Sequence, residues 1–270
     1  FKVKDPYRLF DSRRFRTAPG PDEPQYPRVG ANIDYYLAGE PAGEVKLEIL
    51  DAEGNVIRVF SSEGGEELVP AGTSVAEWNL AAVGTRKLPK SAGMHRFGWD
   101  LRYPGPWDSD KEGSGRRGPM VPPGTYEARL QVGDWSARQR FEVVMDPRVE
   151  AEGIGPADVM VQAKFALDVR DALTRARDAA DRTEEALEGL DEGEQRDRLE
   201  EIRVSLISNE IRYSQPMLLD QLEYLYRNHI GADQLPGAEA LRRFTVLEEE
   251  LAVLLEELDF TLNAGEQETS

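Results

Sequence analysis

Alternating apolar and polar residues predict short β-strands in the first half of the chain. Val45, Leu47 and Ile49 are separated by charged residues, which is the two-residue period of a strand with one buried face. Residues 51–55 then supply turn-forming side chains before a second apolar run at 56–60. Because so short a turn joins the two runs, we expect them to form a hairpin.

A further strand pattern follows at residues 94–101. Phe97, Trp99 and Leu101 share one face of it and predict a side that points into a core. We place His95 on the polar side of this strand, where a structural role is expected.

Two more strand patterns, at 126–132 and 135–145, are joined by only two residues. This pair, Gly133-Asp134, suits a two-residue hairpin loop with positive φ at its first position. Five to seven such strands lie within residues 31–148, with turn signals between them and no helical period. The pattern predicts an antiparallel β-sandwich of the immunoglobulin or fibronectin type III kind.

The apolar period changes to that of helices after Asp146-Pro147. Pro156 opens a pattern that runs to about residue 190, and Pro236-Gly237 precedes the last one. The positions that we expect to be buried are Met160, Ala163, Leu167, Leu173, Ala176, Ala180, Thr183, Leu187 and Leu190, then Leu199, Ile202, Leu206 and Ile211, then Leu218, Leu222, Leu225 and Tyr226, and finally Leu241, Phe244, Leu247, Leu251, Leu254 and Leu258. Such stripes predict an antiparallel bundle of three or four helices over residues 155–262.

The expected fold class is therefore α+β with two domains. Residues 1–30 are rich in proline and arginine and predict an extended lead-in that lies along another surface; its prolines include Pro19, Pro21, Pro24 and Pro27. We expect residues 263–270 to be a disordered tail. The chain begins at Phe1 without a signal-peptide core, so we expect a mature product or a piece of a longer protein.

The charge is concentrated in the second half. The chain has 33 basic and 51 acidic residues, which gives a net charge of −18. Residues 151–270 carry 12 of the basic and 28 of the acidic residues, so this half contributes −16. An acidic surface repels phosphate backbones and anionic lipids, so we expect no nucleic acid partner and no polybasic docking to membranes. No apolar run is long enough to span a membrane.

Few residues could carry catalysis. The chain has no cysteine and only two histidines, His95 and His229, which lack the spacing of metal ligands. The carboxylate groups at 184–185, 248–250 and 256–257 fall opposite the leucine seam, as solvated helix faces do. We therefore expect no catalytic residue, no cofactor and no metal.

Two local features in residues 99–135 remain open to a binding role. Asp108 to Gly113 resembles a calcium loop, but Pro119 stands where such a loop needs a bidentate acid, and a solvated loop is favoured. Tyr103 and Trp107, which belong to an aromatic group with Trp99 and Trp135, are candidate surface contacts. They would either stack on a glycan or cover a sheet edge or the helical domain.

Several motifs together resemble the C-terminal region of large bacterial proteins with sortilin-like, BNR-repeat β-propellers, often labelled glycosyl hydrolases. The matching segments are Gly93 to Pro104, Pro122 to Tyr126, Met145 to Arg148, Asp5 to Arg8, Glu44 to Gly54 and Tyr213 to Leu222. This chain lacks the propeller and its S-x-D-x-G-x-T-W motif. The resemblance therefore implies an exported, periplasmic or extracellular protein, and it transfers no catalytic residue to this chain.

From these observations we expect a non-catalytic interaction or scaffold module, an extrinsic subunit of a larger envelope-associated complex. Its partners would be other protein subunits, including those of a membrane-bound complex. The alternative is an ancillary glycan-binding domain of a propeller-type carbohydrate-active enzyme.

Overall fold

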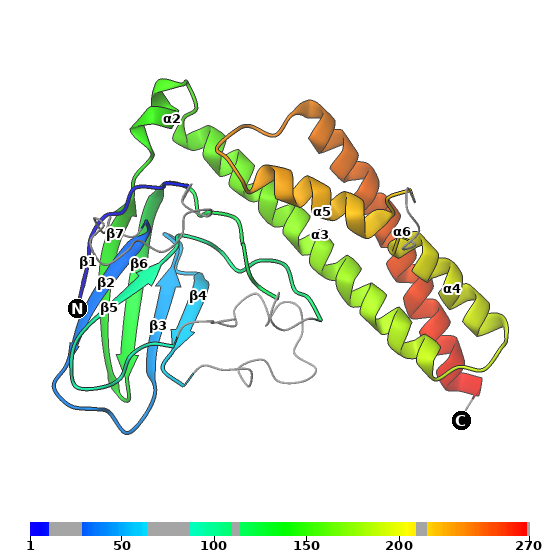
Figure 1. Cartoon of the computed structure of the whole chain (residues 1–270), viewed down its shortest axis with the longest axis horizontal. Helices are drawn as coiled ribbons and strands as arrows, with labels where there is room; N and C mark the ends of the chain where they lie inside the picture. The colour runs from blue at the N-terminus through cyan, green and yellow to red at the C-terminus, as the bar shows by residue number, and fades with distance from the viewer. Residues whose placement is uncertain (11–28, 64–86, 110–113, 209–214, 269–270) are drawn as a thin grey trace, which may run out of the picture. The chain divides into compact units, whose positions relative to one another are not determined.

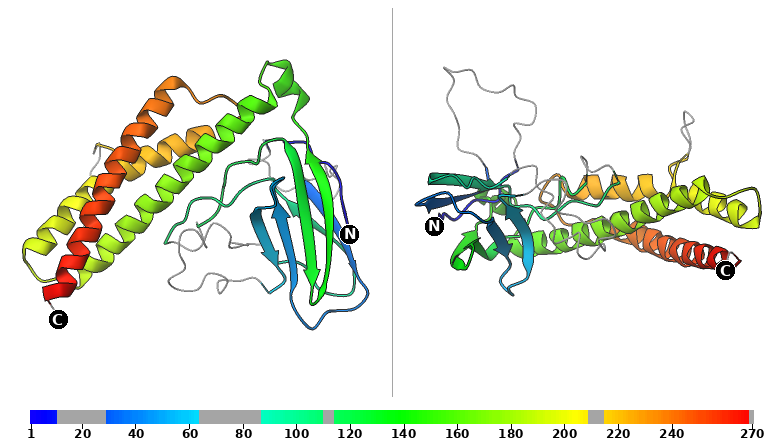
Figure 2. Two further views of the ribbon diagram at one scale, coloured as in Figure 1. Left: turned by 180° about the vertical axis from the view of Figure 1, so that it is seen from behind. Right: turned by 90° about the horizontal axis from the view of Figure 1, so that it is seen from below.

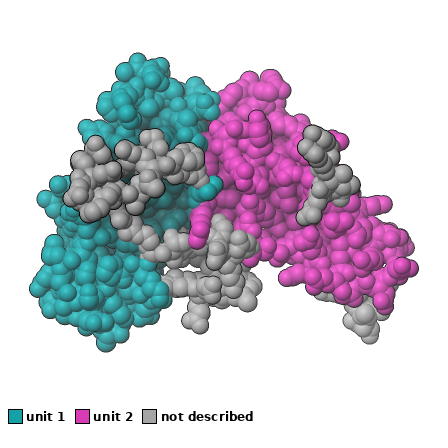
Figure 3. Space-filling model, viewed as in Figure 1, with its two compact units in different colours: residues 1–104, 117–163, 231–235 teal, residues 105–116, 164–230, 236–270 magenta. Residues whose placement is uncertain are grey.

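The computed structural model describes residues 1–10, 29–63, 87–109, 114–208 and 215–268 (Figure 1). Within these residues the protein is α+β, with two antiparallel sheets and five helices. Its contacts divide it into two compact units (Figure 3). The first, called the β unit here, comprises residues 1–104, 117–163 and 231–235, and the second, the helical unit, comprises residues 105–116, 164–230 and 236–270.

The strands of the β unit form a three-stranded and a four-stranded sheet (Figure 2). The smaller sheet has the order β1 (Lys2–Val3), β2 (Ala31–Leu37) and β5 (Gly93–Trp99). The larger sheet has the order β4 (Val56–Ser61), β3 (Val45–Leu50), β6 (Gly124–Val132) and β7 (Trp135–Val143). Both predicted hairpins, β3–β4 and β6–β7, are confirmed, and Gly133 has a φ of 56° in the turn between β6 and β7.

Side chains of both sheets share one hydrophobic core. Phe60 of β4 packs against Phe97 of β5 with ring centroids 4.7 Å apart, and Trp99 meets Tyr126 of β6 edge-on at 6.1 Å. The prediction that Trp99 points into the core is confirmed, and its indole nitrogen donates to the carbonyl of Arg102 at 3.1 Å. Each large side chain buried here contributes about 1.5–3 kcal/mol, so burial rather than the turns stabilises the sheets.

The position of His95 differs from the prediction. Residues 95 and 97 have the same parity along β5, so His95 shares the face of Phe97, while Met94 is exposed on the other face. The ring of His95 is half-buried 5.2 Å from that of Tyr35, and its Nε2 lies 2.7 Å from the carbonyl oxygen of Ser91. The expectation of a polar side was wrong because strand parity places this residue on the core face.

The first ten residues bond to strands of both sheets. β1 pairs with β2, while Pro6 and Arg8 form backbone hydrogen bonds of 2.9 and 2.8 Å to Val144, next to β7. The side chain of Arg8 is buried in an ion pair with Asp233, and its Nε donates to the carbonyl of Val121 at 2.8 Å. Residues 11–28 of the predicted lead-in, which include Pro19, Pro21, Pro24 and Pro27, lie outside the described residues.

Helices occur where the apolar residues change from strand spacing to helical spacing, as predicted. They are α2 (Pro147–Ala151), α3 (Pro156–Glu188), α4 (Glu194–Leu206), α5 (Leu218–His229) and α6 (Ala238–Glu268). Asp146 caps α2 by accepting a hydrogen bond from the backbone nitrogen of Arg148 at 2.9 Å. α6 continues past residue 262, where the helical domain was expected to end. Ile211 and Tyr213 lie outside the described residues.

The helical unit has a hydrophobic core of its own. The expected seam of α6 is confirmed at Leu247, Leu251, Leu254 and Leu258, all of which are buried. The prediction was wrong for Met160 and Leu241, which are exposed. In each case the preceding residue is buried or packs on a core instead: Val159, which belongs to the β unit, is buried, and Ala240 packs against the core of the helical unit. The stripe is thus displaced by one residue near the start of each of these two helices.

Acid is expected to weaken the β unit through Glu48. Burial by itself raises the pKa of Glu48, but hydrogen bonds from Lys46 and Arg129 outweigh burial and hold this pKa below its ordinary value. A carboxyl group whose folded pKa is lowered contributes stability above its unfolded pKa, about 4.3 for glutamate, and loses that contribution as the pH falls through the folded pKa. We therefore expect Glu48→Gln to lower the free energy of unfolding at pH 7 by about 1–2 kcal/mol, with the difference from the native chain vanishing at acid pH.

Urea unfolding of both proteins at several pH values from neutral to strongly acid tests this expectation. The matched control is Glu40→Gln, because Glu40 is exposed and forms no ion pair within the described part of the chain. If Glu48→Gln lowered the free energy of unfolding by the same amount in strong acid as at pH 7, the charge of Glu48 would not be the source of this stability.

Candidate interaction site

The loop of residues 105–116, between β5 and β6, belongs to the helical unit. The nitrogen of Gly105 donates to the carbonyl of Gly115 at 2.7 Å, and the nitrogen of Gly115 donates to the carbonyl of Pro106 at 2.9 Å. A Cβ on Gly105 would lie 1.8 Å from the carbonyl oxygen of Arg116, so only glycine allows this close approach. The two arms of the loop are therefore held together by backbone contacts.

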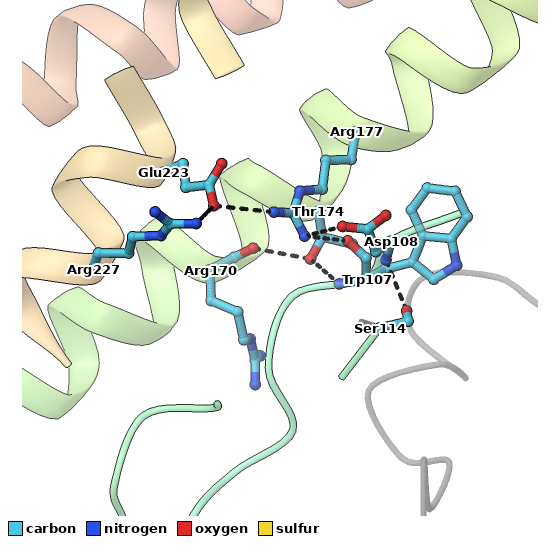
Figure 4. Close-up of polar contacts among 8 residues, drawn as sticks. All are labelled: Trp107, Asp108, Ser114, Arg170, Thr174, Arg177, Glu223 and Arg227. Atoms are coloured by element: carbon cyan, nitrogen blue, oxygen red, sulfur yellow. Dashed lines mark hydrogen bonds and ion pairs between the residues drawn. The ribbon is translucent and has the colours of Figure 1, made fainter. Parts of the chain in front are cut away.

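Trp107 is anchored on α3 through its backbone (Figure 4). Its nitrogen donates to Oγ1 of Thr174 at 3.1 Å, and its carbonyl accepts from Nη1 of Arg177 at 3.1 Å. The Thr174 hydroxyl is fully buried and donates in turn to the carbonyl of Arg170 at 2.9 Å. Every polar group in this chain of contacts thus has a partner, as burial requires.

Arg177 joins the loop to two helices. Its guanidinium lies 2.9 Å from Oδ2 of Asp108 and 3.8 Å from Oε1 of Glu223 on α5 (Figure 4). Glu223 also pairs with Arg227, one turn further along α5, and the nitrogen of Asp108 donates to Oγ of Ser114 at 2.7 Å. Because arginine pairs with both carboxylates, this cluster serves to hold the loop in place.

The structure places the two predicted contact residues in different surroundings. Tyr103 is half-buried against the core of the β unit, and its nitrogen donates to the carbonyl of Pro119 at 2.9 Å. Trp107 is also half-buried, in the loop of the helical unit. Of the other two aromatic residues considered, Trp99 is in the core and Trp135 is 53% exposed at the start of β7. A surface role for Tyr103 and Trp107 stays a prediction.

The segment that resembles a calcium loop is only partly described. Asp110 to Gly113 lie outside the described residues, and the carboxylate of Asp108 pairs with Arg177. Among the residues that are described, no group of three or more His, Asp or Glu side chains is arranged to hold a metal ion. His229 is buried at the end of α5, where its ring meets Phe165 edge-on at 4.9 Å.

The outer face of α6 carries an exposed apolar stripe. Val246, Val253 and Phe260 follow one another at seven-residue intervals and are 47%, 55% and 66% exposed. Seven residues are nearly two helical turns, so the three side chains lie in one row. We call this row the α6 stripe. The seven-residue spacing of these three residues is visible in the sequence, but the surface contacts that we predicted from the sequence lie elsewhere, at Tyr103 and Trp107.

Glutamates border the α6 stripe on both sides. Glu249 and Glu256 lie three residues after Val246 and Val253, and Glu250 and Glu257 lie four residues after them; all four glutamates are exposed. Residues three and four positions along a helix fall on either side of the starting residue. Within the described chain none of the four forms an ion pair, whereas nearby Glu248 pairs with Arg175 at 2.6 Å and Asp259 with Arg182 at 2.6 Å.

A pocket of about 280 Å³ opens at the C-terminal end of the stripe, between α4 and α6. Its lining is Arg198, Glu201, Ile202, Glu257, Phe260 and Thr261. Thr261 is fixed at this point because Nε2 of Gln195 donates to its carbonyl at 3.0 Å. The pocket thus combines an apolar surface with two carboxylates and the guanidinium of Arg198, which pairs with Glu194 at 2.6 Å.

Comparisons with known proteins identify no relative. No protein-family model matches the chain, and neither the curated proteins nor the solved structures contain a match. None of the helices in the described residues is both long enough and apolar enough to cross a membrane.

Proposed function

We propose that this chain is a non-catalytic protein-interaction or scaffold module that acts outside the cytoplasm. It would be an extrinsic subunit that helps to hold a larger, envelope-associated complex together, including one bound to a membrane. The observation that carries this proposal is the α6 stripe, because three exposed apolar side chains in one row leave a helix face suited to a partner.

The architecture supports an adhesive role. We propose that the two sheets form an immunoglobulin- or fibronectin-type sandwich and that the helices form an antiparallel bundle. Both architectures present extended outer faces to partners, although a fold by itself does not specify a function. The resemblance to the C-terminal region of sortilin-like propeller proteins supports a periplasmic or extracellular location and a bacterial source.

Purification of the chain with its neighbours from the native envelope tests this function. We expect stoichiometric co-purification with other polypeptides and a total buried area above about 1,000 Å² in the complex. Isolation of the protein only as a monodisperse monomer, with no polypeptide cross-linked to it before extraction, would contradict the proposal.

Glycan binding is the second candidate, and the exposed ring of Trp135 favours it. An aromatic ring on a strand end can stack on a sugar face. Titration with oligosaccharides while tryptophan fluorescence is recorded separates the two functions, with Trp135→Ala as the control for signal from this residue. A fluorescence response that Trp135→Ala abolishes would favour glycan binding.

A further inference from the structure

We infer that the α6 stripe binds a basic amphipathic helix of a partner protein. This inference rests on the proposed function and names the chemistry of the partner. The stripe extends over 15 residues, from Val246 to Phe260, so that its ends are about 21 Å apart at a rise of 1.5 Å per residue. A partner helix of three heptads is long enough to cover it.

The spacing of the stripe favours a helix over an extended peptide. Val246, Val253 and Phe260 repeat every seven residues, which is the heptad repeat of a helix that packs lengthwise against another helix. An extended strand would instead need a free sheet edge to supply backbone hydrogen bonds. α6 offers side chains only, because its own backbone hydrogen bonds are made within the helix.

The charge around the stripe determines the sign of the partner. Glu249, Glu250, Glu256 and Glu257 lie directly beside the stripe, three or four residues after Val246 and Val253, and no lysine or arginine follows Arg243 in the sequence. A partner with lysine or arginine at its flanking positions would pair with these carboxylates.

The same charge disfavours the other possible occupants. A second copy of α6 would bring glutamate against glutamate, which destabilises a helix pair. Anionic lipid headgroups and nucleic acid would be repelled in the same way.

The pocket between α4 and α6 would accept a side chain at one end of the partner helix. α4 lies beside the C-terminal part of α6 (Figure 2), and the pocket extends the stripe at Phe260. Ile202 and Phe260 line it with apolar surface, and Glu201 and Glu257 supply two carboxylates against one guanidinium, that of Arg198, which pairs with Glu194 at 2.6 Å. A lysine or arginine side chain matches this lining, since its aliphatic stem packs on apolar groups and its charged end reaches the carboxylates.

Binding of a labelled peptide to the full chain tests the inference. The probe is a fluorescein-labelled peptide of three heptads with leucine at positions a and d and lysine at e and g. A matched peptide carries glutamate at e and g. Two variants of the protein remove the two features separately: Val253→Ser with Phe260→Ser removes apolar surface, and Glu250→Gln with Glu257→Gln removes charge.

The control variants make the same chemical changes elsewhere. Leu241→Ser changes an exposed apolar residue of α6 that lies off the stripe, and Glu184→Gln with Glu185→Gln removes two exposed carboxylates of α3. All of the substituted side chains are exposed, so circular dichroism is expected to show the same helix content in every protein.

We expect the lysine peptide to bind and the glutamate peptide not to bind. The Val253/Phe260 variant should bind at least about tenfold more weakly, and the Glu250/Glu257 variant about fivefold more weakly with a reduced dependence on salt. Both control variants should stay within about twofold of the native chain.

Three results would overturn the inference. The first is equal binding of both peptides, and the second is an equal loss of binding in the control variants. The third is that the native chain is a dimer while the Val253/Phe260 variant is a monomer, because the stripe would then bind a second copy of the chain. If complexes recovered from the native envelope contain this variant as readily as the native chain, the inference fails while the proposed scaffold function stands.

Discussion

Replacement of Arg8 by alanine is expected to lower the free energy of unfolding of the β unit by about 3–5 kcal/mol. The side chains of Arg8 and Asp233 are 2% and 1% exposed, so the substitution would leave a carboxylate without a counter-charge in the protein interior. Oδ2 of Asp233 already has no hydrogen-bond partner within the described residues. The ion pair with Arg8 is therefore the main interaction that offsets the cost of burying the Asp233 carboxylate, and the substitution removes it.

Arg8 remains charged at neutral pH despite its burial. Desolvation, together with the nearby charge of Arg102, lowers the pKa of Arg8 to about 10. This value is still well above pH 7, so the ion pair with Asp233 is present under ordinary conditions. The hydrogen bond from Nε of Arg8 to the carbonyl of Val121, at 2.8 Å, would be lost with it.

Denaturant unfolding followed by tryptophan fluorescence measures this effect. Arg96→Ala is the matched control, because Arg96 forms a comparable two-bond pair with Asp34 at 2.6 and 2.7 Å but in an exposed position. We expect a much smaller change for Arg96→Ala. The double variant Arg8→Met with Asp233→Leu should recover part of the loss, since it leaves no unpaired charge. Equal effects of Arg8→Ala and Arg96→Ala would refute this account.

The second large effect is expected at Gly105 and Gly118. A Cβ on Gly118 would lie 1.8 Å from the carbonyl oxygen of Tyr103, the same distance that separates a Cβ on Gly105 from the carbonyl oxygen of Arg116. In both cases the obstacle is backbone, which cannot rotate away as a side chain can. We expect Gly105→Ala and Gly118→Ala each to cost about 2–4 kcal/mol.

Gly43→Ala is the matched control for both substitutions. A Cβ on Gly43 would meet no atom within 4 Å, so we expect its effect to stay within about 0.5 kcal/mol. Thermal and urea unfolding of the three variants, compared with the native chain, provide the measurement. If Gly105→Ala proved as stable as Gly43→Ala, the close approach of the two loop arms would not exist in solution.

These two predictions concern contacts that the sequence analysis could not anticipate. Gly105 occurs in a proline- and glycine-rich run whose composition is typical of any surface loop, and its neighbour across the loop is ten residues away at Gly115. Asp233 likewise looks like an ordinary acidic loop residue, and Arg8 precedes it by 225 positions. No periodicity connects such positions, because their contacts arise from how distant segments pack.

The interaction site was predicted only in part. The sequence predicts that the glutamates of α6 lie opposite the leucine seam, and the exposure of Glu249, Glu250, Glu256 and Glu257 agrees with that prediction. We singled out Tyr103 and Trp107 for surface contact and passed over Val246, Val253 and Phe260. Apolar residues of a helix are usually assigned to its buried side, and only the structure shows that a second apolar row remains exposed.

Short-range patterns along the chain were sufficient to predict most of the local structure of this protein. Alternation with a period of two specified the strands, Gly133 specified a hairpin turn, and leucines at three- and four-residue intervals specified the buried face of α6, because each signal acts between residues that are close along the chain. The tertiary structure alone decided that Arg8 meets Asp233, that the 105–116 loop belongs to the helical unit, and that the α6 stripe stays uncovered. Those outcomes depend on distant segments, whose packing is set by the shape and charge of whole surfaces.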